Sequence, residues 1–152
     1  EQERKRSLRN GTPLSMLVLD LDHFKQVNDQ HGHEAGDRAL RHVAGTLRAS
    51  LRATDLATRL GGEEFAILLT NTTADQAHRV AEKIRNEIES NPVSYQDQAI
   101  RLTISGGIAQ FGPDGADLRS LIGRADEYLY NAKDAGRNRI ISSESVLVPC
   151  QA

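Results

Sequence analysis

The hydrophobic pattern of the chain begins with a short, continuous apolar run, Met16-Leu17-Val18-Leu19, which leads into Asp20-Leu21-Asp22. Such a run is typical of a strand buried on both faces. Two more strand-like runs, about residues 56–60 and 65–69, flank Gly61-Gly62-Glu63-Glu64, and glycines between two such runs indicate a hairpin. We therefore expect a strand and a hairpin whose ends carry acidic side chains.

Three other segments have the periodicity of amphipathic helices. Apolar residues recur at spacings of three and four over about residues 40–51, 77–88 and 118–129. Thr73 and Gln76 have the spacing of a capping box just before the second segment. The pattern thus predicts three helices, the second of which begins close to Thr73.

Two further segments predict strands. Ile100, Leu102 and Ile104 alternate with polar residues, as in a strand with one buried face. The last short apolar run, Arg139-Ile140-Ile141, predicts an edge strand.

The predicted order of elements is βαββαβ, followed by a further helix and strand. This is the order of an α+β fold with a ferredoxin-like split βαβ sheet, central and antiparallel, with helices on one face. The first strand and the hairpin should lie side by side at its centre. We expect one domain over residues 13–142, preceded by the end of an incoming linker helix at residues 1–12 and followed by a C-terminal tail at residues 143–152.

Composition narrows the classes of function. The 152 residues carry 19 Lys and Arg against 21 Asp and Glu, a formal net charge of -2. A protein that binds a nucleic-acid polymer would be expected to carry an excess of basic residues, so we expect no such partner. No apolar run approaches the roughly 18 residues of a membrane span, and the single cysteine, Cys150, excludes an internal disulfide. These features predict a cytoplasmic domain without membrane contact.

Two acidic clusters occupy strand ends that this topology brings together. Asp20 and Asp22 follow the first strand, and Glu63 and Glu64 lie in the hairpin turn. Neighbouring carboxylates raise one another's pKa unless a cation neutralises them, and a hard divalent ion such as Mg²⁺ prefers oxygen ligands. The alternative is a pair of solvated acidic turns. Gly61-Gly62 likewise has two interpretations, a tight turn that needs positive φ or a place where a phosphate or ribose approaches the backbone.

The same residues resemble a known family. Arg59-Leu60-Gly61-Gly62-Glu63-Glu64-Phe65 resembles the GGDEF or GGEEF element of bacterial diguanylate cyclases. Three more segments are similar to that family's other motifs, in the right order, and the resemblance covers about residues 13–141. They are Asp20-Leu21-Asp22-His23-Phe24-Lys25-Gln26-Val27-Asn28-Asp29, His31-Gly32-His33-Glu34-Ala35-Gly36-Asp37 and Tyr130-Asn131-Ala132-Lys133-Asp134-Ala135-Gly136-Arg137-Asn138.

The resemblance implies the nucleotidyl cyclase catalytic fold and the condensation of two GTP molecules into cyclic di-GMP with release of pyrophosphate. It implies that Asp20 and Glu63 ligate Mg²⁺ through their carboxylates and Leu21 through its carbonyl oxygen, with Mn²⁺ as the alternative ion. Glu64 would support a second metal position. Glu63 would also accept the proton of the attacking 3′-hydroxyl.

The resemblance also implies a set of substrate contacts. Asn28 and Asp37 match positions that read guanine, and His33 matches a further substrate contact. Gly61 and Gly62 would let the substrate approach the turn. The terminal phosphates would be held by the backbone N–H groups of His23 and Phe24 and by the side chains of Lys25, Lys133 and Arg137.

Each of these assignments has a structural alternative. Asn28 could cap a helix end, and Asp37 could be a first-turn acid favoured by the helix dipole. His33 could be a solvated loop histidine. Lys133 and Arg137 could be ordinary dipole partners at a helix C-terminus.

A second site is implied nine residues before the hairpin glycines. Arg52-Ala53-Thr54-Asp55 matches the RxxD motif through which many family members bind their own product as an inhibitor. Lys83 is a further candidate for that site. The alternative is a surface ion pair, which would contribute little stability.

The resemblance extends to partners. Each of two facing domains would hold one GTP, so catalysis requires a homodimer. The family's pattern includes a segment upstream of the first strand that this sequence does not contain. We therefore expect a longer protein with an upstream sensor or dimerisation domain, and a membrane anchor in that upstream region is left open. The competing functions are a non-catalytic module that senses cyclic di-GMP or GTP, and a cyclase that acts on one nucleoside triphosphate.

Overall fold

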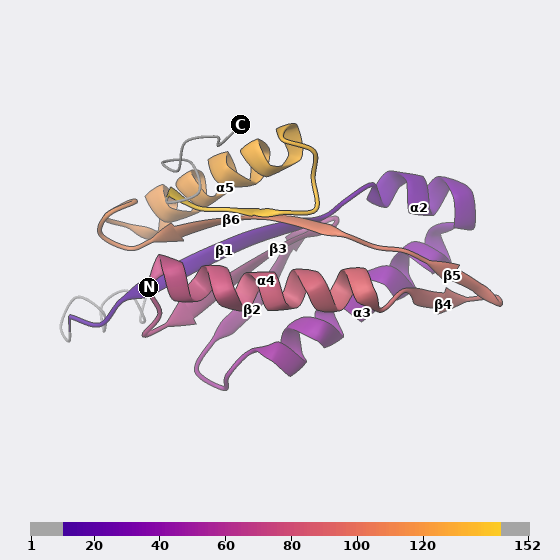
Figure 1. The fold of residues 1–152 in the computed structure, drawn as a ribbon, viewed down its shortest axis with the longest axis horizontal. Coiled ribbons are helices and arrows are strands. Elements are labelled where there is room, and N and C mark those ends of the chain that lie inside the picture. The colour runs from indigo at the N-terminus through magenta and orange to yellow at the C-terminus, as the bar shows by residue number, and fades with distance from the viewer. Residues whose placement is uncertain (1–10, 144–152) are drawn as a thin grey trace, which may run out of the picture.

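The computed structural model describes residues 11–143. The expected linker helix, the C-terminal tail and Cys150 lie almost entirely outside these residues. A five-stranded sheet and a separate two-stranded hairpin make up the β structure (Figure 1). The sheet strands are β1 (Leu14–Leu21), β2 (Leu56–Gly61), β3 (Glu64–Thr70), β6 (Ile104–Gln110) and β7 (Ile140–Ile141); the hairpin strands are β4 (Val93–Tyr95) and β5 (Gln98–Ile100); the helices are α2 (Phe24–His31), α3 (His33–Ser50), α4 (Ala74–Ser90) and α5 (Leu118–Asp134).

The strand order is β2-β3-β1-β6-β7, so β1 lies at the centre of the sheet beside β3, as predicted. β1 runs antiparallel to both β3 and β6, and β7 pairs with β6 in parallel at the edge. Alternate residues of β1 face two separate hydrophobic cores: Leu17 and Leu19 belong to one, Met16 and Val18 to the other. Both faces of β1 are therefore buried, which is why its sequence is continuously apolar.

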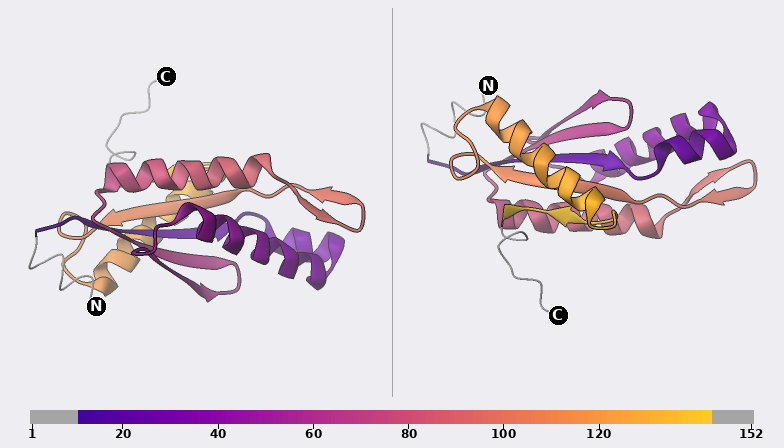
Figure 2. Two further views of the ribbon diagram at one scale, coloured as in Figure 1. Left: turned by 90° about the horizontal axis from the view of Figure 1, so that it is seen from below. Right: turned by 90° about the horizontal axis from the view of Figure 1, so that it is seen from above.

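The helices cover both faces of the sheet. α3 and α4 pack on one face, whereas α5 crosses the other (Figure 2). The additional helix thus corrects the expectation that helices lie on one face only. Gly107 of β6 explains how closely α5 approaches, because a Cβ there would lie 2.0 Å from the carbonyl oxygen of Ala125 and 2.5 Å from the backbone nitrogen of Leu129.

The expected strand over Ile100, Leu102 and Ile104 is only partly correct. All three side chains are buried, but Ile100 ends β5, residues 101–103 connect, and Ile104 begins β6. The alternating pattern correctly identifies buried side chains, but it does not mark the hydrogen-bonded strand, which continues through Gly106 and Gly107. The pattern missed this part because glycines carry no hydrophobic signal.

The predicted start of α4 is confirmed. The hydroxyl of Thr73 accepts from the backbone N–H of Gln76 at 3.2 Å, and the Gln76 side chain accepts from the backbone N–H of Thr73 at 2.9 Å. This reciprocal pair is a capping box. Within residues 11–143, no helix has the length and apolar content needed to cross a membrane.

Candidate functional site

The end of β1 and the tip of the β2–β3 hairpin lie together, as the topology predicted. Asp20 is opposite Glu64 in the register of β1 and β3. Beyond this pair, the backbone N–H of Leu21 donates to the carbonyl oxygen of Glu63 at 3.2 Å. The sheet therefore brings both acidic clusters to one edge, the one at which β1 ends and the β2–β3 hairpin turns.

Asp20 is a buried carboxylate at the end of β1, opposite the hairpin. It is 5% exposed, and Lys133 of α5 donates to its Oδ2. Its Oδ1 is buried and has no hydrogen-bond partner among the described residues. Burial raises the pKa of the Asp20 carboxyl; the Lys133 ammonium opposes this shift, and the charges of Glu63 and Asp22 reinforce it. A buried carboxylate oxygen without a hydrogen-bond donor is unfavourable, and a cation bound beside it would stabilise it.

Burial and neighbouring negative charges act on Glu64 as they do on Asp20. Its side chain is half-buried, and burial raises the pKa of its carboxyl. The negative charges of Asp126 on α5 and of Asp20 raise this pKa further. The edge of the sheet thus concentrates negative charge that Lys133 balances only in part.

The donors at this edge fit a hard divalent cation. Lys133 already places a positive group on Asp20 Oδ2, and the orphaned Oδ1 is available beside Glu63 and Glu64. Among residues 11–143, no three His, Cys, Asp or Glu side chains form a ready metal cage. The orphaned Oδ1 of Asp20 fits an ion such as Mg²⁺, which is commonly held by one or two carboxylates together with waters and substrate phosphates.

Asp22 does not share this role, although the sequence groups it with Asp20. Its Oδ2 accepts from the Thr103 hydroxyl at 2.7 Å and from the backbone N–H of Asn138 at 3.0 Å, and its Oδ1 accepts from the Ser105 hydroxyl at 2.7 Å. Each of its oxygens is satisfied within the protein. Asp22 therefore fixes the end of β1.

Gly61 and Gly62 support both interpretations of the turn. Their φ angles are 149° and 50°, and the left-handed value at Gly62 is one that residues with side chains rarely adopt. A Cβ on either glycine would meet no atom within 4 Å. The turn needs glycine for its conformation, and it also leaves open space against the backbone.

The N-terminus of α2 directly follows β1. His23 is the N-cap residue with φ 57°, no side chain caps this end, and the first turn contains no acidic residue. Its first backbone N–H groups, Phe24 included, are available to an anion. Lys25 is exposed one residue further along.

The two predicted guanine-reading residues lie on neighbouring helices. Asn28 of α2 points at α3, since a Cβ on Gly36 would lie 1.9 Å from Asn28 Oδ1. This placement does not match a helix-end cap. Asp37, in the second turn of α3, lines a cavity of about 560 Å³ between α3 and the β2–β3 hairpin, with Leu40 beside it. The alternative of a first-turn acid is therefore wrong for Asp37.

The remaining predicted residues are distributed around this edge. His33 is exposed and is the first residue of α3, not a loop residue. Lys133 lies in the last turn of α5, but it pairs with Asp20 and is not merely a dipole partner. Arg137 follows α5, is exposed and has a left-handed backbone with φ 66°.

Arg52 and Asp55 form an ion pair of 3.2 Å that is more than a surface contact. The Asp55 side chain is only 3% exposed, and it also accepts from the backbone N–H of Thr70 at 3.2 Å. Arg52 reaches the hydroxyl of Thr72 at 2.9 Å. The pair ties the loop after α3 to the end of β3. Lys83 is exposed on α4 and lines a hollow between α3 and α4.

Sequence reasoning missed Asp126, whose charge raises the pKa of Glu64. It lies seven residues before Lys133 on α5, a spacing of about two helical turns that places both residues on one side of a helix. That spacing was the available signal. Asn138, which bonds Asp22, was also missed, and its signal was its place in the last motif.

Comparisons with known proteins identify the family of this chain. The sequence model of the family described as "Diguanylate cyclase, GGDEF domain" matches residues 1–139. Diguanylate cyclase A of Treponema denticola is 42% identical over 134 residues, which are 88% of this chain and 36% of the relative. The response regulator PleD of Caulobacter vibrioides is 40% identical over 139 residues, or 90% of this chain and 31% of PleD. The chain thus spans about a third of the length of these relatives.

Solved structures show the same fold. The GGDEF domain of DgcB from Caulobacter crescentus, in complex with c-di-GMP, matches with a TM-score of 0.88 at 35% identity, covering 95% of this chain and 85% of that one. The active GGEEF domain of a diguanylate cyclase from Vibrio cholerae matches with a TM-score of 0.86 at 33% identity, covering 93% and 89%. The family's sequence model matches nearly the whole length of this chain, and the chain shares its fold with these structures. This chain therefore belongs to the GGDEF-domain diguanylate cyclase family.

Proposed function

We propose that this domain condenses two GTP molecules into cyclic di-GMP with release of pyrophosphate, as one half of a homodimer and with Mg²⁺ bound. The observation that carries the proposal is the buried Oδ1 of Asp20 beside the Glu63-Glu64 turn, which has no hydrogen-bond partner within residues 11–143. The similarity to an active GGEEF domain and to a GGDEF domain in complex with c-di-GMP supports it.

The carboxylates of Asp20 and Glu63 and the carbonyl oxygen of Leu21 are proposed to hold the ion, with Glu64 at a second metal position. Mn²⁺ offers the same preference for oxygen ligands and is the expected substitute. When bound, the ion stabilises negative charge that develops on the α-phosphate. Glu63 then accepts the proton of the attacking 3′-hydroxyl as the new phosphodiester bond forms and pyrophosphate leaves.

Positive charge around the phosphates comes from three side chains. Lys25 is exposed at the start of α2, and Arg137 is exposed after α5. Lys133 pairs with Asp20. We propose that it turns to the phosphates when the nucleotide binds. The free N–H groups at His23 and Phe24 complete the cradle.

Guanine recognition is assigned to the α2–α3 pair. The carboxylate of Asp37 accepts from guanine N1–H and its amino group, and the Asn28 amide donates to a ring acceptor. His33, at the start of α3, makes a further contact with the substrate. Gly61 and Gly62 let the ribose and phosphates lie against the hairpin turn.

The decisive experiment measures the product. The chain, fused to a dimeric coiled coil, is incubated with GTP and Mg²⁺, and cyclic di-GMP and pyrophosphate are assayed by mass spectrometry and an enzyme-coupled assay. Glu63→Ala is expected to abolish turnover because it removes a metal ligand, while Glu127→Ala, on the exposed side of α5, serves as the control. Undiminished turnover by Glu63→Ala would refute the assignment of that residue.

Feedback control through Arg52, Asp55 and Lys83 is a further part of the proposal. Asp55 offers an acceptor for a guanine edge, and the guanidinium of Arg52 remains half-exposed despite its pairing. These residues also favour the second candidate function, a module that binds cyclic di-GMP or GTP without turnover. Product binding abolished by Arg52→Ala, with no turnover in the longer protein, would support that alternative. Finding 3′,5′-cyclic GMP as the main product would instead indicate a cyclase acting on one nucleotide.

A further inference from the structure

The segment that follows α5 has an unusual backbone. Gly136, Arg137 and Asn138 have φ angles of 122°, 66° and 49°, three positive values in a row. Residues with side chains pay roughly 1–3 kcal/mol for such conformations, which persist only where the surroundings fix them. Asparagine tolerates the left-handed region better than most residues, whereas arginine does not. Something must therefore hold Arg137 in place.

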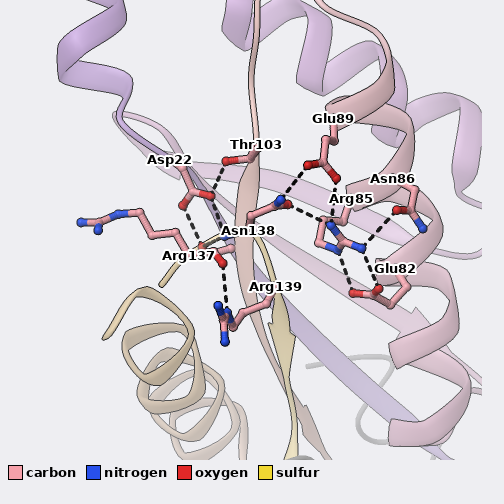
Figure 3. Close-up of polar contacts among 10 residues, drawn as sticks. Asp22, Glu82, Arg85, Asn86, Glu89, Thr103, Arg137, Asn138 and Arg139 are labelled. Atoms are coloured by element: carbon pink, nitrogen blue, oxygen red, sulfur yellow. Dashed lines mark hydrogen bonds and ion pairs between the residues drawn. The ribbon is translucent and has the colours of Figure 1, made fainter. Parts of the chain in front are cut away.

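Asn138 makes the contacts that fix this segment (Figure 3). Its backbone N–H donates to Asp22 Oδ2 at 3.0 Å and to the Ser105 hydroxyl at 3.1 Å. Its side-chain amide donates to Glu89 Oε2 at 2.8 Å, and its Oδ1 accepts from Arg85 at 2.9 Å. One residue thereby joins the end of β1, β6 and helix α4.

Both anchors of Asn138 are held by further contacts. On α4, the Arg85 side chain is only 16% exposed and is held by ion pairs to Glu82 at 2.9 Å and to Glu89 at 3.2 Å. On the sheet, Asp22 is buried and is also bonded by the hydroxyls of Thr103 and Ser105. A satisfied polar network of this kind specifies one geometry.

Arg137 has none of these ties. Its side chain points away from α4 in Figure 3, and within residues 11–143 its guanidinium makes no hydrogen bond or ion pair. Its carbonyl oxygen accepts from the side chain of Arg139 at 3.0 Å. The direction in which Arg137 projects is thus set by its own backbone and by its neighbour Asn138.

We propose that Asn138 is a positioning residue for the nucleotide: it fixes the left-handed turn and so aims Arg137 at the phosphates. This inference rests on the proposed function, in which Arg137 contacts phosphate. Asn138 itself need not touch the substrate. Its contribution should appear only while Arg137 is present.

A double-mutant cycle tests this dependence. The dissociation constant of a non-hydrolysable GTP analogue is measured with Mg²⁺ by calorimetry on the full chain. Arg137→Ala and Asn138→Ala should each weaken binding by about 10-fold, the scale of one lost hydrogen bond to a charged group. The double variant should also be weakened about 10-fold. A product near 100-fold would show independent effects and overturn the proposal.

Matched variants separate positioning from folding. Asn86 accepts from the same Arg85 at 3.1 Å but does not touch Asn138, so Asn86→Ala should bind the analogue like the unsubstituted chain. Asn138→Gly retains the left-handed backbone and the N–H to Asp22 while losing only the tie to α4, and it should weaken binding less than Asn138→Ala. If Asn138→Ala does not fold, the same cycle is run with Asn138→Gly.

The outcomes also distinguish this inference from the proposed function. Unchanged binding by folded Asn138 variants would overturn the positioning role and leave GTP condensation standing. Failure of the unsubstituted chain to bind the analogue would overturn the proposed function, and this inference with it.

Discussion

At the scale of single residues, Gly36 illustrates how a missing side chain serves the site. It is buried in α3, and a Cβ there would lie 1.9 Å from Asn28 Oδ1 and 3.2 Å from a ring carbon of Phe24. Gly36 therefore makes room for the side chain proposed to read guanine.

Gly36→Ala should separate stability from binding. Alanine in a helix interior is favoured over glycine by roughly 0.5–1 kcal/mol, which offsets part of the local clash. Displacement of the Asn28 amide should weaken GTP binding by about 10-fold, the value of a lost polar contact to the base. Calorimetry for binding and thermal unfolding for stability are the measurements.

Gly45→Ala is the matched control for that substitution. Gly45 lies in the same helix, and a Cβ there would meet nothing within 4 Å. It should raise the melting temperature and leave GTP affinity unchanged. Equal affinities in the two variants would contradict the role given to Gly36.

Glu64 should make stability depend on pH in a predictable direction. Burial and the charges of Asp126 and Asp20 raise the pKa of its carboxyl in the folded protein. The charged form is therefore destabilising: the penalty is absent below the unfolded pKa of 4.5 and grows to its full size as pH rises through the folded pKa.

Glu64→Gln tests this prediction in the absence of divalent ions. The substitution should raise the free energy of unfolding at pH 8, and this advantage should fade toward pH 4. Urea denaturation in EDTA across that range is the measurement. Glu127→Gln, at an exposed position on α5, is the control for removal of a surface carboxylate. A constant difference between Glu64→Gln and the unsubstituted chain at all pH values would argue against the assigned cause.

At the scale of elements, the contact between α5 and β6 depends on Gly107. A Cβ there would lie against backbone atoms of Ala125 and Leu129, neither of which can move like a side chain. Gly107→Ala should lower the free energy of unfolding by about 3 kcal/mol, the upper range for overpacking. Chemical denaturation is the measurement.

Gly123→Ala provides the comparison on α5 itself. A Cβ on Gly123 would meet nothing within 4 Å, so alanine should stabilise the helix by about 0.5–1 kcal/mol. Similar free energies of unfolding in Gly107→Ala and Gly123→Ala would show that α5 shifts without loss of stability.

Gly107→Ala should also impair nucleotide binding, because α5 carries Lys133.

Element order was predictable because α3, α4 and α5 each bury one face with a helical repeat, and because β1 and β3 are nearly continuous apolar runs. What remained hidden depends on residues without a hydrophobic signal. Gly106 and Gly107 concealed most of β6, and α2 is short, with Val27 as its one buried residue. Asp20 and Asp22 look alike in the sequence, and only hydrogen-bond partners from Thr103, Ser105 and Asn138 separate their roles.

At the scale of the whole molecule, the Arg52–Asp55 pair connects the loop after α3 to the end of β3, at the far end of β3 from the Glu63-Glu64 turn. Arg52→Ala should preserve turnover while raising the cyclic di-GMP concentration for half-inhibition by at least 10-fold, since it removes a guanidinium fork. Initial rates at increasing product concentration measure this effect.

Thr72→Val is the control for the structural part of that substitution. It removes the hydroxyl that Arg52 contacts at 2.9 Å but retains the guanidinium. Inhibition should remain close to that of the unsubstituted domain. If Arg52→Ala gives the same inhibition curve as the unsubstituted domain, the regulatory site is not at the RxxD motif.

The pairing of Lys133 with Asp20 has a thermodynamic consequence. The Lys133 ammonium pairs with one oxygen of Asp20, the proposed metal ligand, so free Mg²⁺ would compete with it for this carboxylate. A nucleotide's phosphates give Lys133 another partner and release that oxygen. Metal and nucleotide should therefore bind with positive heterotropic coupling, and by linkage each raises the affinity of the other by the same factor. On the proposed function, we expect the domain to take up its ion together with GTP and to bind the ion only weakly in the absence of nucleotide.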